Sequence, residues 1–129
     1  MKVFVVDDSN AVFESLQLML SGISGVVLVG HALDEAGAIE DVKRLLPDVV
    51  ILDLHLQSGS GMAVLAEIAK HHSATKVIVL SNYANESYMT RCKEYGADYF
   101  FDKSFQFMLV RDVLERLVCE KKMVDRSGE

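Results

Sequence analysis

Five short apolar segments alternate along the chain with five longer segments in which apolar residues recur every three or four positions. The short segments are rich in Val, Ile and aromatic residues, and most of them contain no polar residue; they cover residues 3–6, 26–29, 49–52, 77–80 and 99–101. Uninterrupted apolar runs of this length predict strands that are buried on both faces, as in a parallel sheet.

The longer segments predict amphipathic helices, because their apolar residues fall on one face at helical spacing. The expected helices cover residues 9–22, 35–46, 61–72, 85–95 and 104–119. Ser9, Asn85 and Ser104 stand at N-cap positions, where a side-chain oxygen can accept a bond from a free backbone N–H. Pro47 ends the second helix, and Gly96 ends the fourth. Alternating strands and helices predict a single α/β domain, a doubly wound parallel sheet with helices on both faces.

Length, composition and charge fit this fold and narrow the function. The 129 residues, half of them hydrophobic, suffice for one domain with a core. We assign residues 1–119 to that domain and interpret the polar residues 120–129 as a C-terminal tail or the start of a linker. The net charge of -6 argues against direct nucleic-acid binding, which needs clustered Lys and Arg. We expect no membrane span and no signal peptide, and therefore a cytoplasmic location.

Polar side chains follow four of the five predicted strands. Asp7 and Asp8 end the first strand, and Asp53 ends the third. Ser81 ends the fourth, and Lys103 follows the fifth after one intervening residue. Ligands of doubly wound sheets bind at the carboxyl ends of the strands. If the first and third strands are neighbours and the fourth and fifth follow on one side, all these groups converge on one rim.

This combination of residue types favours phosphoryl chemistry with a metal ion. Three carboxylates and one ammonium give a local charge near -2, which suits a hard cation such as Mg²⁺ or Mn²⁺. Such a cation can clamp phosphoryl oxygens and leave one carboxylate free as a nucleophile. Asp53, which stands alone after its strand, is the best nucleophile, whereas Asp7 and Asp8 are placed to hold the metal. Lys103 would pair with a phosphoryl oxygen, and the Ser81 hydroxyl would donate to another.

Each of these residues also has a purely structural explanation. Aspartate after a strand is a common turn residue, and Asp7 and Asp8 could simply begin the first helix. Ser81 could be ordinary loop polarity, and Lys103 a solvated surface lysine. The shared position of all four groups, at the same end of successive strands, favours the functional hypothesis.

The sequence resembles the receiver domain family of two-component response regulators over about residues 2–119. Four motifs carry the resemblance: Val-Val-Asp-Asp-Ser at residues 5–9, Val-Val-Ile-Leu-Asp-Leu at 49–54, Val-Leu-Ser-Asn at 79–82 and Gly-Ala-Asp-Tyr-Phe-Phe-Asp-Lys at 96–103. The resemblance implies a CheY-like, flavodoxin-like (βα)5 sheet with strand order 2-1-3-4-5.

The resemblance also implies a role for each residue of the site. Asp53 corresponds to the phosphoacceptor and Lys103 to the lysine that pairs with the phosphoryl group. Asp8 corresponds to the more direct metal ligand and Asp7 to a partner that acts more through water. The backbone carbonyl of His55 corresponds to the third protein ligand of the metal.

Four side chains correspond to positions that respond to the phosphoryl group. Ser81 matches the switch hydroxyl, and Phe100, here in place of the commoner Tyr, matches the switch aromatic. His55 and Tyr83 match positions that flank the phosphoryl group and tune its lifetime. Their alternative is that of exposed loop residues without a kinetic role.

Two segments depart from the usual family pattern. Gln57 and Ser58 stand where the family often has Pro-Gly. Ser104 follows Lys103 where the family commonly has Pro after a cis peptide bond. Because cis bonds before other residues are costly, we expect no cis bond here. Neither departure touches the acidic residues.

The function implied is that of a signalling switch rather than an enzyme. A histidine kinase or phosphotransfer protein would phosphorylate Asp53 in a Mg²⁺-dependent reaction. Phosphorylation would change an interaction surface within residues 85–119, through which a homodimer could also form. The output would be an effector domain outside this chain, for example a DNA-binding one, or a stand-alone activity.

Three other functions are compatible with a sheet of this kind and differ in the residues that they require. A phosphatase of the haloacid dehalogenase type needs a second Asp two residues after its nucleophile, where this chain has His55. A flavin-binding electron carrier needs a phosphate-cradling loop after the first strand, where Asp7 and Asp8 would repel the phosphate. A phosphate-independent receiver-like binding module usually loses an acidic residue or the lysine. All are present here, and this module remains the principal alternative.

Overall fold

The computed structural model describes residues 1–127 of the chain and the side chains of residues 1–124. Its five strands are all parallel and form one sheet in the order β2-β1-β3-β4-β5. The strands are β1 (Lys2–Val6), β2 (Val27–Ala32), β3 (Val49–Leu52), β4 (Lys76–Ser81) and β5 (Tyr99–Asp102). This confirms the fold class and the strand order implied by the family resemblance.

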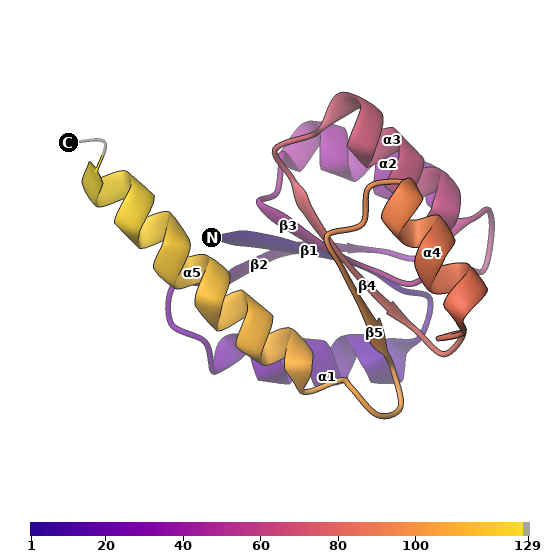
Figure 1. The fold of residues 1–129 in the computed structure, drawn as a ribbon, viewed down its shortest axis with the longest axis horizontal. Coiled ribbons are helices and arrows are strands. Elements are labelled where there is room, and N and C mark those ends of the chain that lie inside the picture. Colours follow the sequence, from indigo (N-terminus) through magenta and orange to yellow (C-terminus); the bar gives the residue numbers. More distant parts are fainter. Residues whose placement is uncertain (128–129) are drawn as a thin grey trace.

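Helices cover both faces of the sheet, as Figure 1 shows. Helices α1 and α5 pack on one face and helices α2, α3 and α4 on the other. Their bounds are α1 (Asn10–Ser21), α2 (Glu35–Leu45), α3 (Gly61–His71), α4 (Glu86–Glu94) and α5 (Leu109–Ser127). None of the helices in the described part of the chain is both long and apolar enough to cross a lipid bilayer.

The central strands are apolar between their ends because both of their faces are covered. In β1, Val3 and Val5 contribute to the core beneath α1 and α5, whereas Phe4 and Val6 contribute to the core beneath α2, α3 and α4. All four side chains are fully buried. Burial on both faces explains the lack of polar alternation in the sequence, and it leaves polar residues only at the strand ends.

Two of the three predicted N-caps are confirmed. Ser9 Oγ accepts a hydrogen bond from the Val12 N–H at the start of α1, with an O···N distance of 3.3 Å. Asn85 Oδ1 accepts one from the Tyr88 N–H at the start of α4, at 3.0 Å. Each side chain satisfies a backbone donor that the first turn of a helix leaves free.

The predicted start of the fifth helix at Ser104 is wrong. The Asp102 carboxylate accepts hydrogen bonds from the N–H groups of Ser104 and Phe105, at 2.8 and 3.1 Å, and ties these residues into a turn. Side chains of Asp commonly compete with helix formation in this way. Helix α5 therefore begins at Leu109.

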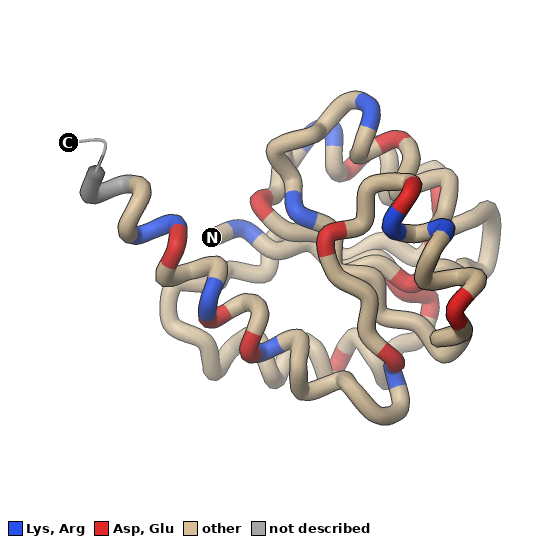
Figure 2. The backbone as a smooth tube through the Cα atoms, in the orientation of Figure 1, with Lys and Arg blue, Asp and Glu red and all other residues tan. Residues whose placement is uncertain are grey.

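The predicted end of the fifth helix at residue 119 is also too early. Helix α5 continues to Ser127, and the Lys121 ammonium forms an ion pair with Asp48 at the edge of the sheet, 3.1 Å away. Acidic and basic residues are interspersed along this helix (Figure 2). Most of the predicted tail is thus helical, and residues 128–129 lie outside the described part of the chain. The domain boundary at residue 119 stays a prediction.

Candidate functional site

Three aspartates converge where β1 and β3 end. The two strands are neighbours, with Val6 opposite Leu52, so the residues that follow them project from the same rim. Asp7, Asp8 and Asp53 each place a carboxylate oxygen within 4.8 Å of the other two. Asp7 and Asp53 are buried, at 2% and 6% exposure, whereas Asp8 is open to solvent.

Lys103 brings a single ammonium into this acidic cluster. Its Nζ lies 2.9 Å from Asp7 Oδ2 and 3.6 Å from Asp53 Oδ2, and its side chain is only 11% exposed. The backbone N–H of Lys103 donates to the carbonyl of Ser81, so that β4 fixes the start of the β5–α5 loop. One cation against three carboxylates leaves the cluster with an excess of negative charge, as the sequence predicts.

This excess of negative charge affects the pKa of Asp53. Burial raises the pKa of the Asp53 carboxyl, and the Lys103 ammonium opposes that effect. The carboxylates of Asp7 and Asp8 raise the pKa further, whereas a weak hydrogen bond from the His55 N–H, at 3.4 Å, lowers it. The net shift is upward, so the folded protein disfavours the ionised form of Asp53 unless a further positive charge approaches it.

The three side chains offer the ligands that a hard divalent cation prefers. All their donor atoms are carboxylate oxygens, which suit Mg²⁺ or Mn²⁺ rather than a thiolate- or imidazole-seeking metal. The open side of the cluster is at Asp8, where a cation could keep several waters. The residues present therefore fit the metal that the sequence predicts.

Ser81 lies at the end of β4, beside β3, and is fully buried. Its Oγ accepts a hydrogen bond from the Tyr83 N–H at 3.0 Å. A hydroxyl oxygen that accepts this bond can still donate through its own hydrogen. The sequence-predicted hydroxyl is thus at the same rim of the sheet as the acidic cluster.

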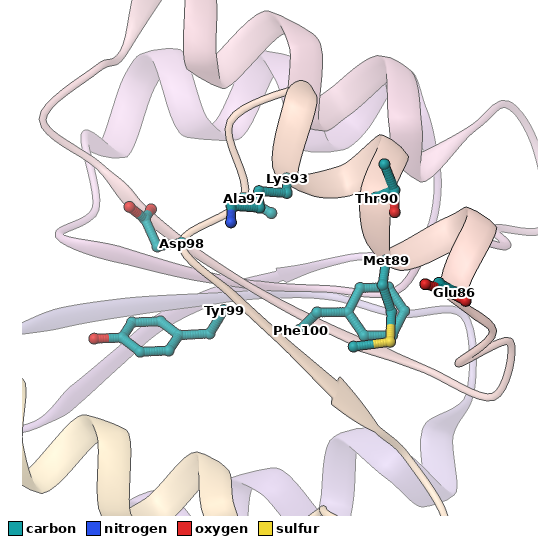
Figure 3. A pocket seen from close by; sticks show the side chains of 8 residues that line it. All are labelled: Glu86, Met89, Thr90, Lys93, Ala97, Asp98, Tyr99 and Phe100. Carbon is teal, nitrogen blue, oxygen red and sulfur yellow. The ribbon is translucent and has the colours of Figure 1, made fainter.

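Phe100 lies apart from the acidic cluster, on the outer edge of the sheet. Its ring is half-buried in a groove between α4 and β5, where it lies near Met89 (Figure 3). The groove is lined by Glu86, Met89, Thr90, Lys93, Ala97, Asp98, Tyr99 and Phe100. Phe100 shares this groove with residues of α4, and its partner in the neighbouring strand β4 is Val79. It can therefore respond to movements of the strand that ends in the buried hydroxyl.

Two aromatic side chains that follow the ends of β3 and β4 pack against each other and against α4. The rings of His55 and Tyr83 have centroids 4.0 Å apart, and both residues are exposed. Tyr88 from α4 completes the group, with its centroid 5.8 Å from His55 and 6.0 Å from Tyr83. His55 and Tyr83 were predicted from the sequence, and Tyr88 was not. A tyrosine on a solvent-facing helix carries no pattern that would have marked it.

Two further residues that the sequence analysis missed hold the backbone around the site. His31 Nε2 in β2 lies 2.7 Å from the carbonyl oxygen of Asp7. Glu35 in α2 accepts a hydrogen bond from the Ser60 N–H, at 2.8 Å, and its own N–H donates to the carbonyl of Ser58. Both act between segments that are distant in sequence, and such contacts leave no periodic pattern.

The loop after Asp53 needs glycine where the chain approaches itself closely. A Cβ atom at Gly61 would overlap the backbone carbonyl of Asp53, and one at Gly59 would overlap the Glu35 side chain. Gly59 also has a φ of +85°, which favours glycine. Peptide bonds in the described residues are all trans, and that includes the bond from Lys103 to Ser104.

Comparison with known proteins agrees with this architecture. The sequence profile of the response regulator receiver domain matches residues 3–115. The response regulator domain of CheB from Thermotoga maritima superposes with a TM-score of 0.80 at 28% identity, covering 93% of this chain and 94% of the other. The receiver domain of the putative response regulator NarL from Mycobacterium tuberculosis gives 0.79 at 28% identity, covering 92% and 93%.

Two similar proteins are longer than this chain. The transcriptional regulatory protein YvfU of Bacillus subtilis is 26% identical over 95% of this chain and 61% of its own length. A protein-glutamate methylesterase/protein-glutamine glutaminase of Geobacter sulfurreducens is 32% identical over 91% of this chain and 33% of its own length. The chain therefore spans between about a third and three fifths of the length of these two relatives.

Proposed function

The chain belongs to the response regulator receiver domain family, and from that premise we propose that it is a switch phosphorylated on Asp53 in a Mg²⁺-dependent reaction. One observation carries the proposal. Asp7, Asp8 and Asp53 converge at one end of the sheet around the single ammonium of Lys103. A structural role would require no such surplus of carboxylates, because burying unbalanced charge is costly.

The phosphoryl donor is a histidine kinase or a phosphotransfer protein. A carboxylate oxygen of Asp53 forms the new P–O bond, and the P–N bond of the phosphohistidine breaks. The electron pair of that bond stays on the leaving imidazole, which takes up a proton. Lys103, whose Nζ already lies 3.6 Å from Asp53, pairs with an oxygen of the incoming phosphoryl group. The Ser81 hydroxyl donates to another.

The metal would be held by the carboxylates of Asp7, Asp8 and Asp53 together with the backbone carbonyl of His55. When bound, it supplies the positive charge that lets an anionic phosphoryl group approach an acidic pocket. The open position of Asp8 leaves room for water on that side. Asp7 is engaged by Lys103 at 2.9 Å, which supports a less direct role for it than for Asp8.

Phosphorylation replaces one carboxylate by a group of greater negative charge with three acceptor oxygens. Ser81 moves toward those oxygens, and Phe100 turns from the α4–β5 groove into the space beside β4. This change alters the surface of residues 85–119, through which partners bind and a homodimer can form. The groove that Phe100 lines supports this part of the proposal, because it lies within that surface.

His55 and Tyr83 set the lifetime of the phosphoryl group. Their rings lie 4.0 Å apart, and the His55 N–H is already bonded to Asp53. In this position they limit the approach of the water that hydrolyses the aspartyl-phosphate. Replacing both residues with Ala should therefore change the rate of dephosphorylation and leave the stability of the fold nearly unaltered.

The output depends on what this receiver domain is joined to or binds. One of the two relatives described above is named a transcriptional regulatory protein and the other a protein-glutamate methylesterase/protein-glutamine glutaminase, and both extend beyond the part that matches this chain. By that analogy the output is an effector domain outside this chain, DNA-binding in one version, or a stand-alone interaction in the cytoplasm. The chain itself contributes the phosphoacceptor site and the interaction surface, and no direct contact with nucleic acid or membrane.

The test is phosphorylation by a small-molecule donor such as acetyl phosphate, followed by intact mass, with and without Mg²⁺. We expect a gain of one phosphoryl group that depends on Mg²⁺ and is absent from the Asp53→Asn variant. A folded protein that gains no phosphoryl group under any of these conditions would contradict the proposal. That result would favour the phosphate-independent binding module.

A further inference from the structure

Asp8 differs from the other members of the acidic cluster in how its side chain is held. The Asp7 carboxylate accepts hydrogen bonds from the Ser9 N–H at 2.8 Å and from Lys103 Nζ at 2.9 Å. The Asp53 carboxylate forms an ion pair with the same ammonium. Among residues 1–124, no hydrogen bond or ion pair reaches the Asp8 carboxylate, which is exposed. The backbone that carries Asp8 therefore provides the restraint on where its side chain starts.

That backbone is held by His31. The imidazole Nε2 lies 2.7 Å from the carbonyl oxygen of Asp7, and a carbonyl can only accept, so Nε2 carries the hydrogen. The N–H of Asp7 donates to the carbonyl of Ala32 at 3.1 Å, where β2 ends. The ladder between the two strands stops at this point, and the side chain of His31 supplies the donor for the next carbonyl.

The ring of His31 is itself fixed by α1. It stacks on Phe13 with centroids 3.9 Å apart and planes at 4°. Both residues are half-buried. The stack sets the plane of the imidazole, and the hydrogen bond sets where its Nε2–H points. An ordinary edge-strand histidine would have neither restraint, because it would be free to rotate in solvent.

We propose that His31 is a positioning residue for the metal site. By holding the Asp7 carbonyl it fixes the peptide plane between Asp7 and Asp8, and thereby the direction in which the Asp8 side chain leaves the backbone. This inference rests on the proposed function, because it concerns the same cation. A ligand that is already oriented loses less conformational freedom on binding. Without His31, the buried carbonyl loses its donor and the peptide can rotate.

Two substitutions separate the hydrogen bond from the ring stack. In His31→Gln the amide nitrogen lies the same number of bonds from Cβ as the imidazole Nε2, so this variant keeps a donor and loses the ring. In His31→Phe the aromatic contact with Phe13 remains and the donor is lost. The matched control is His71→Phe, which removes an exposed histidine from α3.

Mg²⁺ binding is measured first without phosphodonor, from the rise in the thermal midpoint over a range of Mg²⁺ concentrations, and its half-maximal Mg²⁺ concentration should shift as the one from the rates does. The second measurement is the phosphorylation rate with acetyl phosphate over the same range. It yields the Mg²⁺ concentration for half-maximal rate and the rate at saturating Mg²⁺. For His31→Phe we expect the half-maximal Mg²⁺ concentration to rise about tenfold, as is typical when a group that orients a metal ligand is lost. The rate at saturating Mg²⁺ should stay near that of the wild type. His31→Gln should restore most of the Mg²⁺ affinity, and His71→Phe should change neither quantity.

Other outcomes would overturn the inference. An unchanged half-maximal Mg²⁺ concentration in His31→Phe would do so, and so would a failure of His31→Gln to restore it. If His31→Phe does not fold, the same comparison is made between His31→Gln and His31→Asn, whose shorter side chain cannot reach the Asp7 carbonyl. A wild-type protein that is not phosphorylated at any Mg²⁺ concentration would refute the proposed function itself. A phosphorylated wild type with an insensitive His31→Phe would refute only the role of His31.

Discussion

The two ends of β3 carry aspartates in contrasting environments. Asp48 precedes the strand and Asp53 follows it, so the two lie on opposite rims of the sheet. The Asp48 carboxylate accepts a hydrogen bond from the Lys2 N–H at 2.7 Å and pairs with Lys121 at 3.1 Å. Burial raises its pKa, but these bonds and the positive charges of Lys121 and the N-terminus outweigh that effect, and the pKa lies below its ordinary value. At Asp53 the balance is reversed, and the pKa lies above it.

The difference lies in the match between donors and acceptors. Around Asp48, donors are sufficient, and the charged carboxylate stabilises the fold by tying β1, β3 and α5 together. Around Asp53, three carboxylates share one ammonium, so the ionised form of Asp53 destabilises the folded state. Carboxyl groups whose pKa is raised by burial and by neighbouring carboxylates are typical of functional sites. The comparison therefore separates a structural aspartate from a reactive one only five positions along the chain.

Removing Lys103 from one rim and Lys121 from the other should give the largest difference between the two rims, measured as the rate of phosphorylation. Lys103→Ala should lower the rate of phosphorylation by acetyl phosphate about a hundredfold or more, because it removes a preorganised charge at the reacting group. Lys121→Ala serves as the matched control and should leave the rate unaltered. Equal rates in the two variants, each shown to be folded, would break the comparison.

Mg²⁺ should act on one rim alone. At a concentration a hundred times its dissociation constant, it should stabilise the wild-type protein by about 3 kcal/mol, measured as a rise in the thermal midpoint. Asp48→Ala should retain this rise, whereas Asp8→Asn should lose most of it. A Mg²⁺ effect that depended on Asp48 and not on Asp8 would place the metal at the wrong end of the sheet.

Asp48→Ala should lower the free energy of unfolding by about 2 kcal/mol, because it removes hydrogen bonds to a charged group. The lowered pKa means that this stabilisation is present above the ordinary aspartate value, near pH 4, and is lost as the pH falls through the folded-state value. Denaturant unfolding at pH 7 and at pH 3 measures it. If the free energies of unfolding of the variant and the wild type differed more at pH 3 than at pH 7, this prediction would be contradicted.

Asp53→Asn should have a smaller effect of the opposite sign. In the absence of metal it should raise the free energy of unfolding at pH 7, because the raised pKa means that the ionised Asp53 disfavours the fold. The stabilising contribution of protonated Asp53 is fully present below pH 4 and is lost as the pH rises through the folded-state value. The advantage of the variant should therefore vanish in acid. Destabilisation at pH 7 would contradict the proposed imbalance of charge.

Much of this site could be predicted from the sequence because of how parallel sheets are built. Strands buried on both faces carry polar residues only at their ends, so Asp7, Asp53 and Ser81 stand out against apolar segments. The carboxyl ends of parallel strands share one rim, which brings these residues together. The neighbouring order of β1 and β3, in contrast, came only from the resemblance to a family.

The parts that could not be predicted depend on contacts between distant segments. Whether Ser104 or Leu109 begins α5 is decided by the Asp102 side chain, which captures the N–H groups of the intervening turn. The contribution of His31 depends on Asp7, twenty-four positions away, and on a ring in α1. Local propensity and periodicity contain no information about such pairs.

The account depends most directly on which aspartate receives the phosphoryl group. After reaction with acetyl phosphate and Mg²⁺, borohydride would reduce the acyl phosphate to homoserine, and tandem mass spectrometry of the digested protein would locate it. We expect homoserine at position 53 and unmodified aspartate at positions 7, 8 and 48. Homoserine at position 7 or 8, or at none of the four, would contradict the assignment of Asp53 as the reactive member of the acidic cluster.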